Sequence, residues 1–315
     1  MKEAAQNRQK FLKEEISRLK KEKNALIMAH YYQREEIQEI ADFIGDSLAL
    51  ARQAAKTDAD VIVMCGVHFM GETAKILCPD KKVIVPDLEA GCSLADSCPP
   101  EEFEKFVKAH PDHTVVSYVN TSAAVKALTD IVVTSGNARK IIEQLPEEEK
   151  IIFGPDHNLG EYINSVTGRN MLLWKGACHV HDRFSLEKIL EMKKDHPQAK
   201  ILVHPECQRP LQLIADKVGS TAALLEYAQK DESQEFIVVT ESGILFEMRR
   251  KCPGKTLLAA PAEDAECQCN ECDFMKLNTL EKVYVALRDG KPLIEVEKEV
   301  AEKALKPIER MLSMS

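Results

Sequence analysis

The sequence lacks the long apolar segments and the basic surface that mark membrane proteins and nucleic-acid-binding proteins. No run approaches the about 18 apolar residues of a membrane span. Lys and Arg number 42 against 51 Asp and Glu, a formal net charge of −9, and aromatic residues make up only 5%. Nucleic-acid surfaces need clustered positive charge, often with interleaved aromatics. We therefore expect no nucleic-acid partner and no membrane contact.

The N-terminal segment also lacks the apolar stretch of a secretory signal, because its first 24 residues are charged throughout. This favours a cytoplasmic protein, in which thiols stay reduced. The ten cysteines then indicate metal binding or catalysis rather than disulfides. The C-x-x-x-C-x-x-C motif of radical-SAM enzymes is absent from the sequence.

The sequence does contain a pattern of residues that recurs three times along the chain. Short apolar runs end at the polar residues His30, Tyr118 and His204, which are 88 and 86 residues apart. Cys92 and Cys178 repeat the second spacing of 86 residues. A fixed period places equivalent residues at equivalent points of each repeat. This repeated pattern therefore predicts three similar units that contribute to one site.

Within each unit, short apolar runs alternate with helical patterns, which is typical of parallel βαβ units. The predicted fold class is α/β, with three similar α/β/α domains whose short parallel sheets are arranged around a pseudo-threefold axis. The expected divisions are an N-terminal helix and first repeat over 1–100, a second repeat over 101–186, a third over 187–275, and a C-terminal helical segment over 276–315 that packs on the first repeat. The N-terminal helix should pack through one apolar face, made of Phe11, Leu12, Ile16 and Leu19.

Predicted helix starts recur with the same spacings, at Ser47, Ser135 and Thr221. Each lies in a short motif of small residues and hydroxyls: GDS, TSG and GST. Hydroxyl groups cap helix N-termini, and an exposed N-terminus can hold phosphate or carboxylate. Although the protein is acidic on average, three converging helix starts would favour an anionic ligand.

Polar side chains gather where the predicted strands end. They are His30 and Tyr32, Tyr118 and Asn120, and His204 and Glu206, with His181 three residues after Cys178. His, Tyr and Glu transfer protons, and Asn or Ser orient carboxylates and phosphate. In open parallel sheets, ligands bind beyond the carboxyl ends of the strands. This edge is the predicted active site.

Three separated cysteines, one from each unit, could hold one metal centre. Cys92 and Cys178 are two of them, and the third unit ends in Cys267, Cys269 and Cys272. Structural zinc sites usually have four protein ligands, whereas an iron–sulfur cubane with three thiolates leaves one iron open as a Lewis acid. Spacing alone does not select the third ligand. Cys267 and Cys269 could be alternate ligands, or a regulatory disulfide could form in the C-x-x-C pair.

An ordered set of motifs resembles the quinolinate synthase family of NAD biosynthesis. The motifs are AHYYQ, GDSLALA, YVNTSA, TSGNA, GACHVH, HPEC, VGST and MKLNTLEK. The resemblance covers roughly residues 26–287 and implies three α/β/α domains around a central 4Fe-4S cluster. It also implies a reaction that condenses iminoaspartate with dihydroxyacetone phosphate to quinolinate, with loss of phosphate and two waters.

The resemblance assigns roles to individual positions. The cluster ligands would be Cys92, Cys178 and Cys272, which leaves Cys267 and Cys269 as non-ligands. Active-site residues would be His30, Tyr32, Ser47, Tyr118, Asn120, Ser135, His181, His204, Glu206, Ser220 and Thr221. Tyr32 and Glu206 are the expected proton-transfer groups, with His204 and His181 as orienting or acid groups and Tyr118 and Asn120 positioning substrate. An iminoaspartate-producing enzyme is the expected transient partner.

Two other interpretations remain open at this stage. The first is a different hydro-lyase that uses an open cubane on another small acid, which a substrate assay would distinguish. The second is a zinc-dependent binding or regulatory protein built on Cys269 and Cys272. Metal analysis separates this second alternative from the enzyme, because a cubane brings about four iron atoms per chain.

Overall fold

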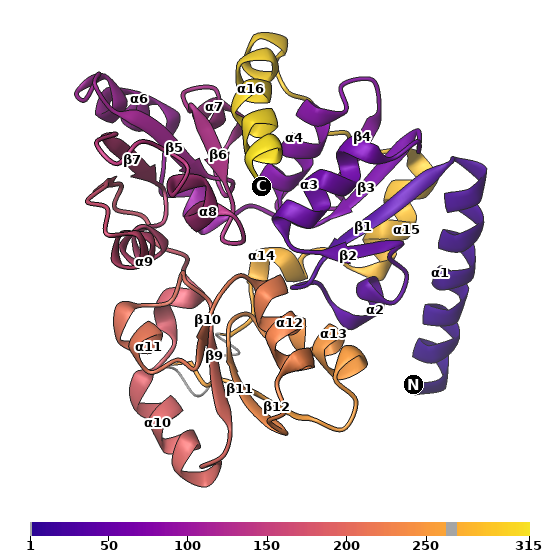
Figure 1. Cartoon of the computed structure of the whole chain (residues 1–315). Helices are drawn as coiled ribbons and strands as arrows, with labels where there is room; N and C mark the ends of the chain where they lie inside the picture. The colour runs from indigo at the N-terminus through magenta and orange to yellow at the C-terminus, as the bar shows by residue number, and fades with distance from the viewer. Residues whose placement is uncertain (1, 263–269) are drawn as a thin grey trace. The chain divides into compact units, whose positions relative to one another are not determined.

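The computed structural model describes residues 2–262 and 270–315 of the chain. These residues form three four-stranded parallel sheets, each flanked by helices (Figure 1). The predicted α/β class and the three similar α/β/α units are therefore confirmed. The pseudo-threefold axis stays a prediction, as do the boundaries of the four segments.

The first sheet belongs to the segment before residue 100. Its strands are β1 (Ala25–His30), β2 (Phe43–Gly45), β3 (Val61–Cys65) and β4 (Lys82–Ile84). The helices of this segment are α1 (Lys2–Glu22), α2 (Glu35–Gln38), α3 (Ser47–Lys56), α4 (His68–Leu77) and α5 (Ser93–Asp96).

The second and third sheets follow with the same alternation. The second segment contains α6 (Pro100–Lys108), β5 (Thr114–Tyr118), α7 (Ala123–Lys126), β6 (Ile131–Val133), α8 (Ala138–Ile142), β7 (Ile151–Gly154), α9 (His157–Thr167), β8 (Leu172–Leu173) and a short 3-10 helix (His181–Arg183). The third contains α10 (Leu186–Asp195), β9 (Lys200–Val203), α11 (Arg209–Leu213), β10 (Lys217–Val218), α12 (Thr221–Lys230), β11 (Glu235–Val239), α13 (Ile244–Lys251) and β12 (Thr256–Ala259). The chain closes with α14 (Asp273–Lys276), α15 (Leu280–Asp289) and α16 (Lys298–Met314).

The strand order is the same in each sheet: β2-β1-β3-β4, β6-β5-β7-β8 and β10-β9-β11-β12. The edge strands β2, β6 and β10 were not predicted, because two or three residues are too few to give a periodic signal. An aspartate just before each of them accepts a hydrogen bond from the first strand of its sheet. The pairs are Asp42 with the Ile27 amide (2.9 Å), Asp130 with the Val115 amide (2.8 Å) and Asp216 with the Ile201 amide (2.8 Å).

The described chain clusters into two compact units, which we describe separately. The first is Met1–Cys92 with Asp273–Glu302, and the second is Ser93–Cys272 with Lys303–Ser315. In the first unit, α1 and α15 pack against the first sheet and bury Leu12, Ile16 and Leu19 as predicted. Phe11 is a correction, because it is 44% exposed and its ring meets Tyr284 edge to face, with ring centroids 6.3 Å apart.

The second unit holds the other two sheets, and their cores are distinct. One core centres on Phe103, Val115 and Ile152, with Trp174 packed against it. The other joins strands β9 and β11 through Ile201, Val203, Ile237 and Val239. Both cores follow from the continuous apolar runs of strands that are buried on two faces.

The predicted helix starts need one correction. Ser47 and Thr221 are indeed the first residues of α3 and α12. Ser135 does not begin a helix: it lies in a turn, and α8 starts three residues later. The reason is Asn137, whose Oδ1 accepts from the Thr134 amide at 2.6 Å and so closes this turn before the helix.

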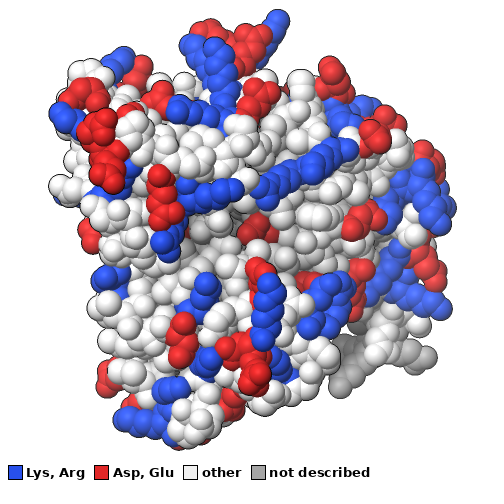
Figure 2. Space-filling view, viewed as in Figure 1, with Lys and Arg blue, Asp and Glu red and all other residues white. Residues whose placement is uncertain are grey.

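The surface agrees with the charge count of the sequence. Acidic and basic side chains are interspersed over the face shown in Figure 2, which fits a protein of net charge −9. Among the helices of the described residues, none is long and apolar enough to cross a membrane.

Candidate active site

Two of the predicted strand-end histidines are held in the same way. The Nδ1 atom of His30 accepts the Tyr32 amide at 3.2 Å, and the Nδ1 atom of His204 accepts the Glu206 amide at 3.3 Å. Both rings are therefore oriented by a backbone amide of their own chain.

Glu206 is the centre of a buried polar group in the second unit. The Tyr118 hydroxyl donates to its Oε1 at 2.5 Å, and its Oε2 lies 3.0 Å from Nδ1 of His181. His204 stacks on His181, with ring centroids 4.6 Å apart. All four side chains are at least 95% buried, so they meet out of contact with bulk water. The sequence prediction that these four residues share a site is consistent with this cluster.

Electrostatics keeps this carboxyl group ionised. Burial opposes the charge, but attraction to His181 and His204, with the hydrogen bonds from His181 and Tyr118, lowers the pKa of Glu206 from 4.5 to about 2. Such a carboxylate is a weak base at neutral pH. It is well suited to orient the imidazoles and the phenol around it.

Four further predicted residues lie in the same unit, and one of them, Ser135, contacts this group. Ser135 Oγ is 3.3 Å from Nε2 of His204. Ser220 caps α12 by accepting the Ala223 amide at 3.3 Å, and together with Thr221 it is buried. Asn120 follows β5, and its buried Oδ1 finds no donor within the described ranges. A buried acceptor of this kind needs a partner, so Asn120 suits a ligand that donates a hydrogen bond.

The predicted residues of the first unit form their own set at the end of β1. The rings of His30 and Tyr32 meet edge to face, with centroids 4.4 Å apart. Lys276 donates to the carbonyl of Tyr32 at 2.7 Å and so ties this strand end to α14. Ser47 is the first residue of α3. Asp46 precedes it and accepts a hydrogen bond from the Ala49 amide at 3.0 Å. The N-cap of α3 is thus an aspartate rather than the hydroxyl expected there.

The segments before three of the cysteines are anchored alike. In each repeat, the third residue after the central strand donates its amide to the carbonyl two residues before a cysteine. The three bonds are His68 to Ala90 (2.7 Å), His157 to Gly176 (2.8 Å) and Ser242 to Asn270 (2.9 Å). The cysteines that follow are Cys92, Cys178 and Cys272. This equivalence singles out Cys272 in the third repeat, although its sequence spacing departs from the period.

The surroundings of these cysteines fit a metal group bound through sulfur. Cys178 and Cys272 are half-buried and pack against the same core around β9 and β11. Cys178 Sγ also lies 3.3 Å from Nδ1 of His181, and ligand atoms of Cys178, His181 and Glu206 all fall within 4.8 Å of one another. Thiolate and imidazole are the donors that iron–sulfur and zinc centres use.

The other cysteines in the described part of the chain are all buried. Cys65 lies inside β3, and burial raises its pKa to about 12. Cys98 has its pKa raised to about 12, first by burial and then by Glu102. Such thiols stay protonated and pack as small apolar groups. Cys267 and Cys269 lie outside the described residues.

A family model for the quinolinate synthetase A protein matches residues 14–313. The chain belongs to this family. A quinolinate synthase of Thermosynechococcus vestitus is 57% identical over 300 residues, which cover 95% of this chain and 94% of the relative. That of a Synechococcus strain is 56% identical with the same coverage, and that of Chloroherpeton thalassium is 55% identical over 96% of this chain and 94% of the relative. The resemblance drawn from the motifs is confirmed.

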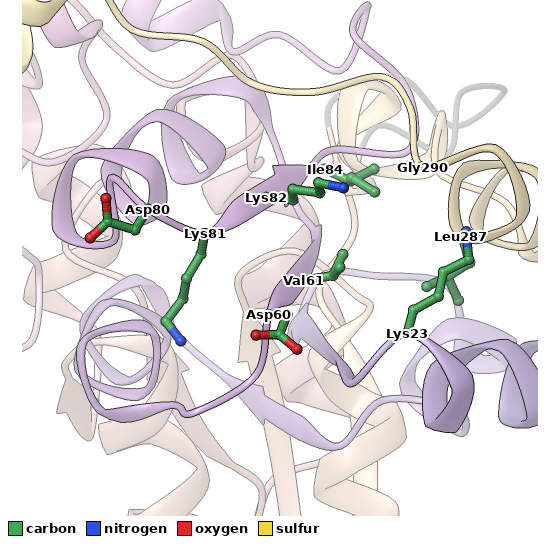
Figure 3. A pocket seen from close by; sticks show the side chains of 9 residues that line it. All are labelled: Lys23, Asp60, Val61, Asp80, Lys81, Lys82, Ile84, Leu287 and Gly290. Carbon is green, nitrogen blue, oxygen red and sulfur yellow. The ribbon is translucent and has the colours of Figure 1, made fainter.

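One cavity of about 620 Å³ in the first unit lies away from the residues predicted by this family resemblance. It is lined by the start of β3 and β4, at Val61 and Lys82, by Lys23 and Lys81, and by α15 (Figure 3). These are the amino ends of the strands, opposite the end at His30. Lys81 and Lys23 already donate to the carbonyls of Ala59 and Arg288.

The sequence reasoning missed several residues of the site. Thr240 is 2.8 Å from Nε2 of His181, and the buried carboxylates Asp156 and Glu241 follow the central strands of their sheets. Ser93 Oγ and His179 Nδ1 are 2.6 Å apart, and each follows a predicted ligand cysteine directly. Ser93 and His179 are 86 residues apart, so the period itself was the signal that could have found this pair.

Proposed function

We propose that this member of the quinolinate synthase family condenses iminoaspartate with dihydroxyacetone phosphate to quinolinate, releasing phosphate and two waters. The observation that carries the proposal is the match to quinolinate synthases at 55–58% identity along nearly the whole chain. The buried group around Glu206 supports it, because it gathers proton-transfer side chains at the carboxyl edge of a parallel sheet.

A 4Fe-4S cluster is the cofactor that we propose, with Cys92, Cys178 and Cys272 as its ligands. The segments before these three cysteines are held by equivalent backbone hydrogen bonds, which supports this set of ligands. When bound, a cluster with three thiolate ligands supplies an open iron that acts as a Lewis acid.

For the chain's own groups, we propose a division between proton transfer and orientation. Tyr32 moves protons during tautomerisation and dehydration, and His204 and His181 act as acid groups. Glu206 stays ionised and holds His181 and Tyr118 in place, since its contacts favour the carboxylate. This refines the expectation that Glu206 itself transfers protons.

The anionic parts of the substrates need hydrogen-bond donors rather than net positive charge. We propose that Ser135, Ser220 and Thr221 bind the anions in the second unit, and that Ser47 and His30 do so in the first. Helix starts and hydroxyls are the usual holders of phosphate and carboxylate. Tyr118 and Asn120 position the condensed intermediate, with the Asn120 oxygen as acceptor.

The test is turnover of iminoaspartate and dihydroxyacetone phosphate by protein reconstituted without oxygen. We expect quinolinate and phosphate in equal amounts, and activity should be lost in Cys178→Ala. Retained activity in that variant would contradict the cluster ligation, whereas an inactive but fully loaded wild-type protein would contradict the substrates.

The group of Cys178, His181 and Glu206 also allows a zinc site, since its donors suit that ion as well. Metal analysis of the anaerobic protein separates the alternatives. We expect about four iron and four sulfide per chain, whereas about one zinc without iron would favour a zinc protein. We also propose a cytoplasmic location and an iminoaspartate-producing enzyme as transient partner.

A further inference from the structure

Two buried carboxylates occupy the same place in the second and third repeats. Asp156 lies two residues after the end of β7, and Glu241 lies two residues after the end of β11. Both side chains are fully buried, at 0% exposure. The corresponding position of the first repeat, two residues after β3, is Val67. The proposed reaction gives neither carboxylate a role.

Each carboxylate divides its two oxygens between a local amide and the amide of a cysteine. Asp156 accepts from Leu159 at 2.7 Å through Oδ1 and from Cys178 at 3.3 Å through Oδ2. Glu241 accepts from Gly243 at 2.7 Å through Oε2 and from Cys272 at 3.1 Å through Oε1. The same pair of hydrogen bonds therefore links the end of β7 to Cys178 and the end of β11 to Cys272. These cysteines lie 22 and 31 residues after the side chains that hold them.

We propose that Asp156 and Glu241 are positioning residues that fix the backbone of Cys178 and Cys272, so that both thiolates face the metal group. The inference rests on the proposed cluster ligation. A buried side-chain oxygen that accepts from an amide in a dry interior forms a directional hydrogen bond. It fixes the peptide plane of the cysteine and with it the direction of the Cα–Cβ bond. It also keeps that amide from turning toward the sulfur.

The three ligands are then not equivalent. Val67 has no side-chain acceptor, so the first repeat lacks the carboxylate that its two counterparts supply. The backbone bond to the carbonyl two residues before the cysteine is common to all three repeats. The additional bond of the second and third repeats therefore gives Cys178 and Cys272 a restraint that Val67 cannot give Cys92.

The test uses two isosteric variants, Asp156→Asn and Glu241→Gln, in the full chain. The oxygen of each amide can keep the shorter local bond, to Leu159 or Gly243, while its NH₂ group then faces the cysteine amide and cannot accept from it. Asn is also a good N-cap, so α9 keeps its start. Asp216→Asn is the matched control, because it weakens the same kind of bond at the amino edge of the third sheet.

Three measurements are made on wild type and variants: thermal unfolding of the apo-protein, the rate at which a chelator removes iron, and the EPR spectrum of the reduced cluster. We expect unfolding of the apo-protein near that of wild type, iron loss about 10-fold faster or more, and an altered EPR spectrum, because a freed amide can bond to sulfur. Asp216→Asn should keep the wild-type rate and spectrum.

The possible results separate the two proposals. If wild type loads about four iron and both folded variants keep its rate of iron loss and its spectrum, the positioning role is refuted while the cluster stands. If wild type itself binds no cluster, the proposed ligation fails first and the positioning role with it. Should Asp156→Asn fail to fold, Glu241→Gln decides the matter, since Glu241 caps no helix.

Discussion

Replacing Glu206 with Gln tests whether the buried carboxylate stabilises the fold as an anion. Gln keeps the shape of the side chain and one acceptor for the Tyr118 hydroxyl, but it removes the charge that faces His181 and His204. The loss should therefore be electrostatic rather than steric. We expect the variant to fold and to be less stable than wild type near neutral pH.

The pKa of Glu206 sets the size of the effect. A fall of the pKa from 4.5 to about 2 corresponds to about 3 kcal/mol at 1.36 kcal/mol per unit. Because the pKa is lower in the folded state, this stabilisation is fully present above pH 4.5 and is lost as the pH falls through about 2. The gap between wild type and variant should be about 3 kcal/mol at pH 6 and roughly 1.5 kcal/mol at pH 3.

The single tryptophan provides the assay. Trp174 lies in the same unit as Glu206 and packs on Phe103 and Phe106, with ring centroids 5.6 and 5.4 Å away. Its fluorescence therefore reports urea unfolding of this unit. Glu226→Gln, an exposed change in the same repeat, should leave the midpoint unchanged. Equal stability of wild type and Glu206→Gln at pH 6, or a gap that widens toward pH 3, would refute the reasoning.

Three other changes have direct outcomes. Cys178→Ser should abolish iron binding after reconstitution, as measured by iron and sulfide analysis, while Cys252→Ala should bind as much iron as wild type does. Equal iron contents of the two variants would contradict the role of Cys178 as a cluster ligand. Gly176→Ala should destabilise by about 1–3 kcal/mol, since a Cβ would lie 2.6 Å from the Pro155 carbonyl; an unchanged urea midpoint would contradict this close approach. Tyr118→Phe removes one bond to Glu206 and should cost about 1.5–3 kcal/mol by the same assay, with turnover reduced; a stability equal to wild type would mean that the bond is weak.

The period of the sequence predicted the repeated architecture well, because it depends on apolar strands that recur at 88 and 86 residues. The central strands and longer helices follow from such patterns. The edge strands β2, β6 and β10 did not, since their two or three residues are defined by pairing with a neighbour rather than by their own composition. Asp42, Asp130 and Asp216 recur with the period and were the available signal.

Within the candidate site, the sequence predicted which residues gather there better than it predicted the contacts that they make. His181, Glu206 and Tyr118 were expected near one another, and both His181 and Tyr118 lie within hydrogen-bonding distance of Glu206. The turn at Ser135 was missed because the Asn137 side chain, and not helix propensity, decides where α8 begins. Asp156 was missed because its partner, the Cys178 amide, lies 22 residues away and carries no side-chain signature.

The aspartates that bond to the first strand of each sheet lie at the amino edge, opposite the carboxyl edge where we propose that the chemistry occurs. At the amino edge the three copies use an identical side chain for an identical bond, and exchanging that edge between copies should change little. At the other edge the copies have diverged, to His, Tyr and His at the strand ends and to Val, Asp and Glu beyond the central strands. Three copies of one fold can therefore differ at the carboxyl edge, where we propose that the substrates bind, while each copy keeps the hydrogen bond that supports its sheet at the amino edge.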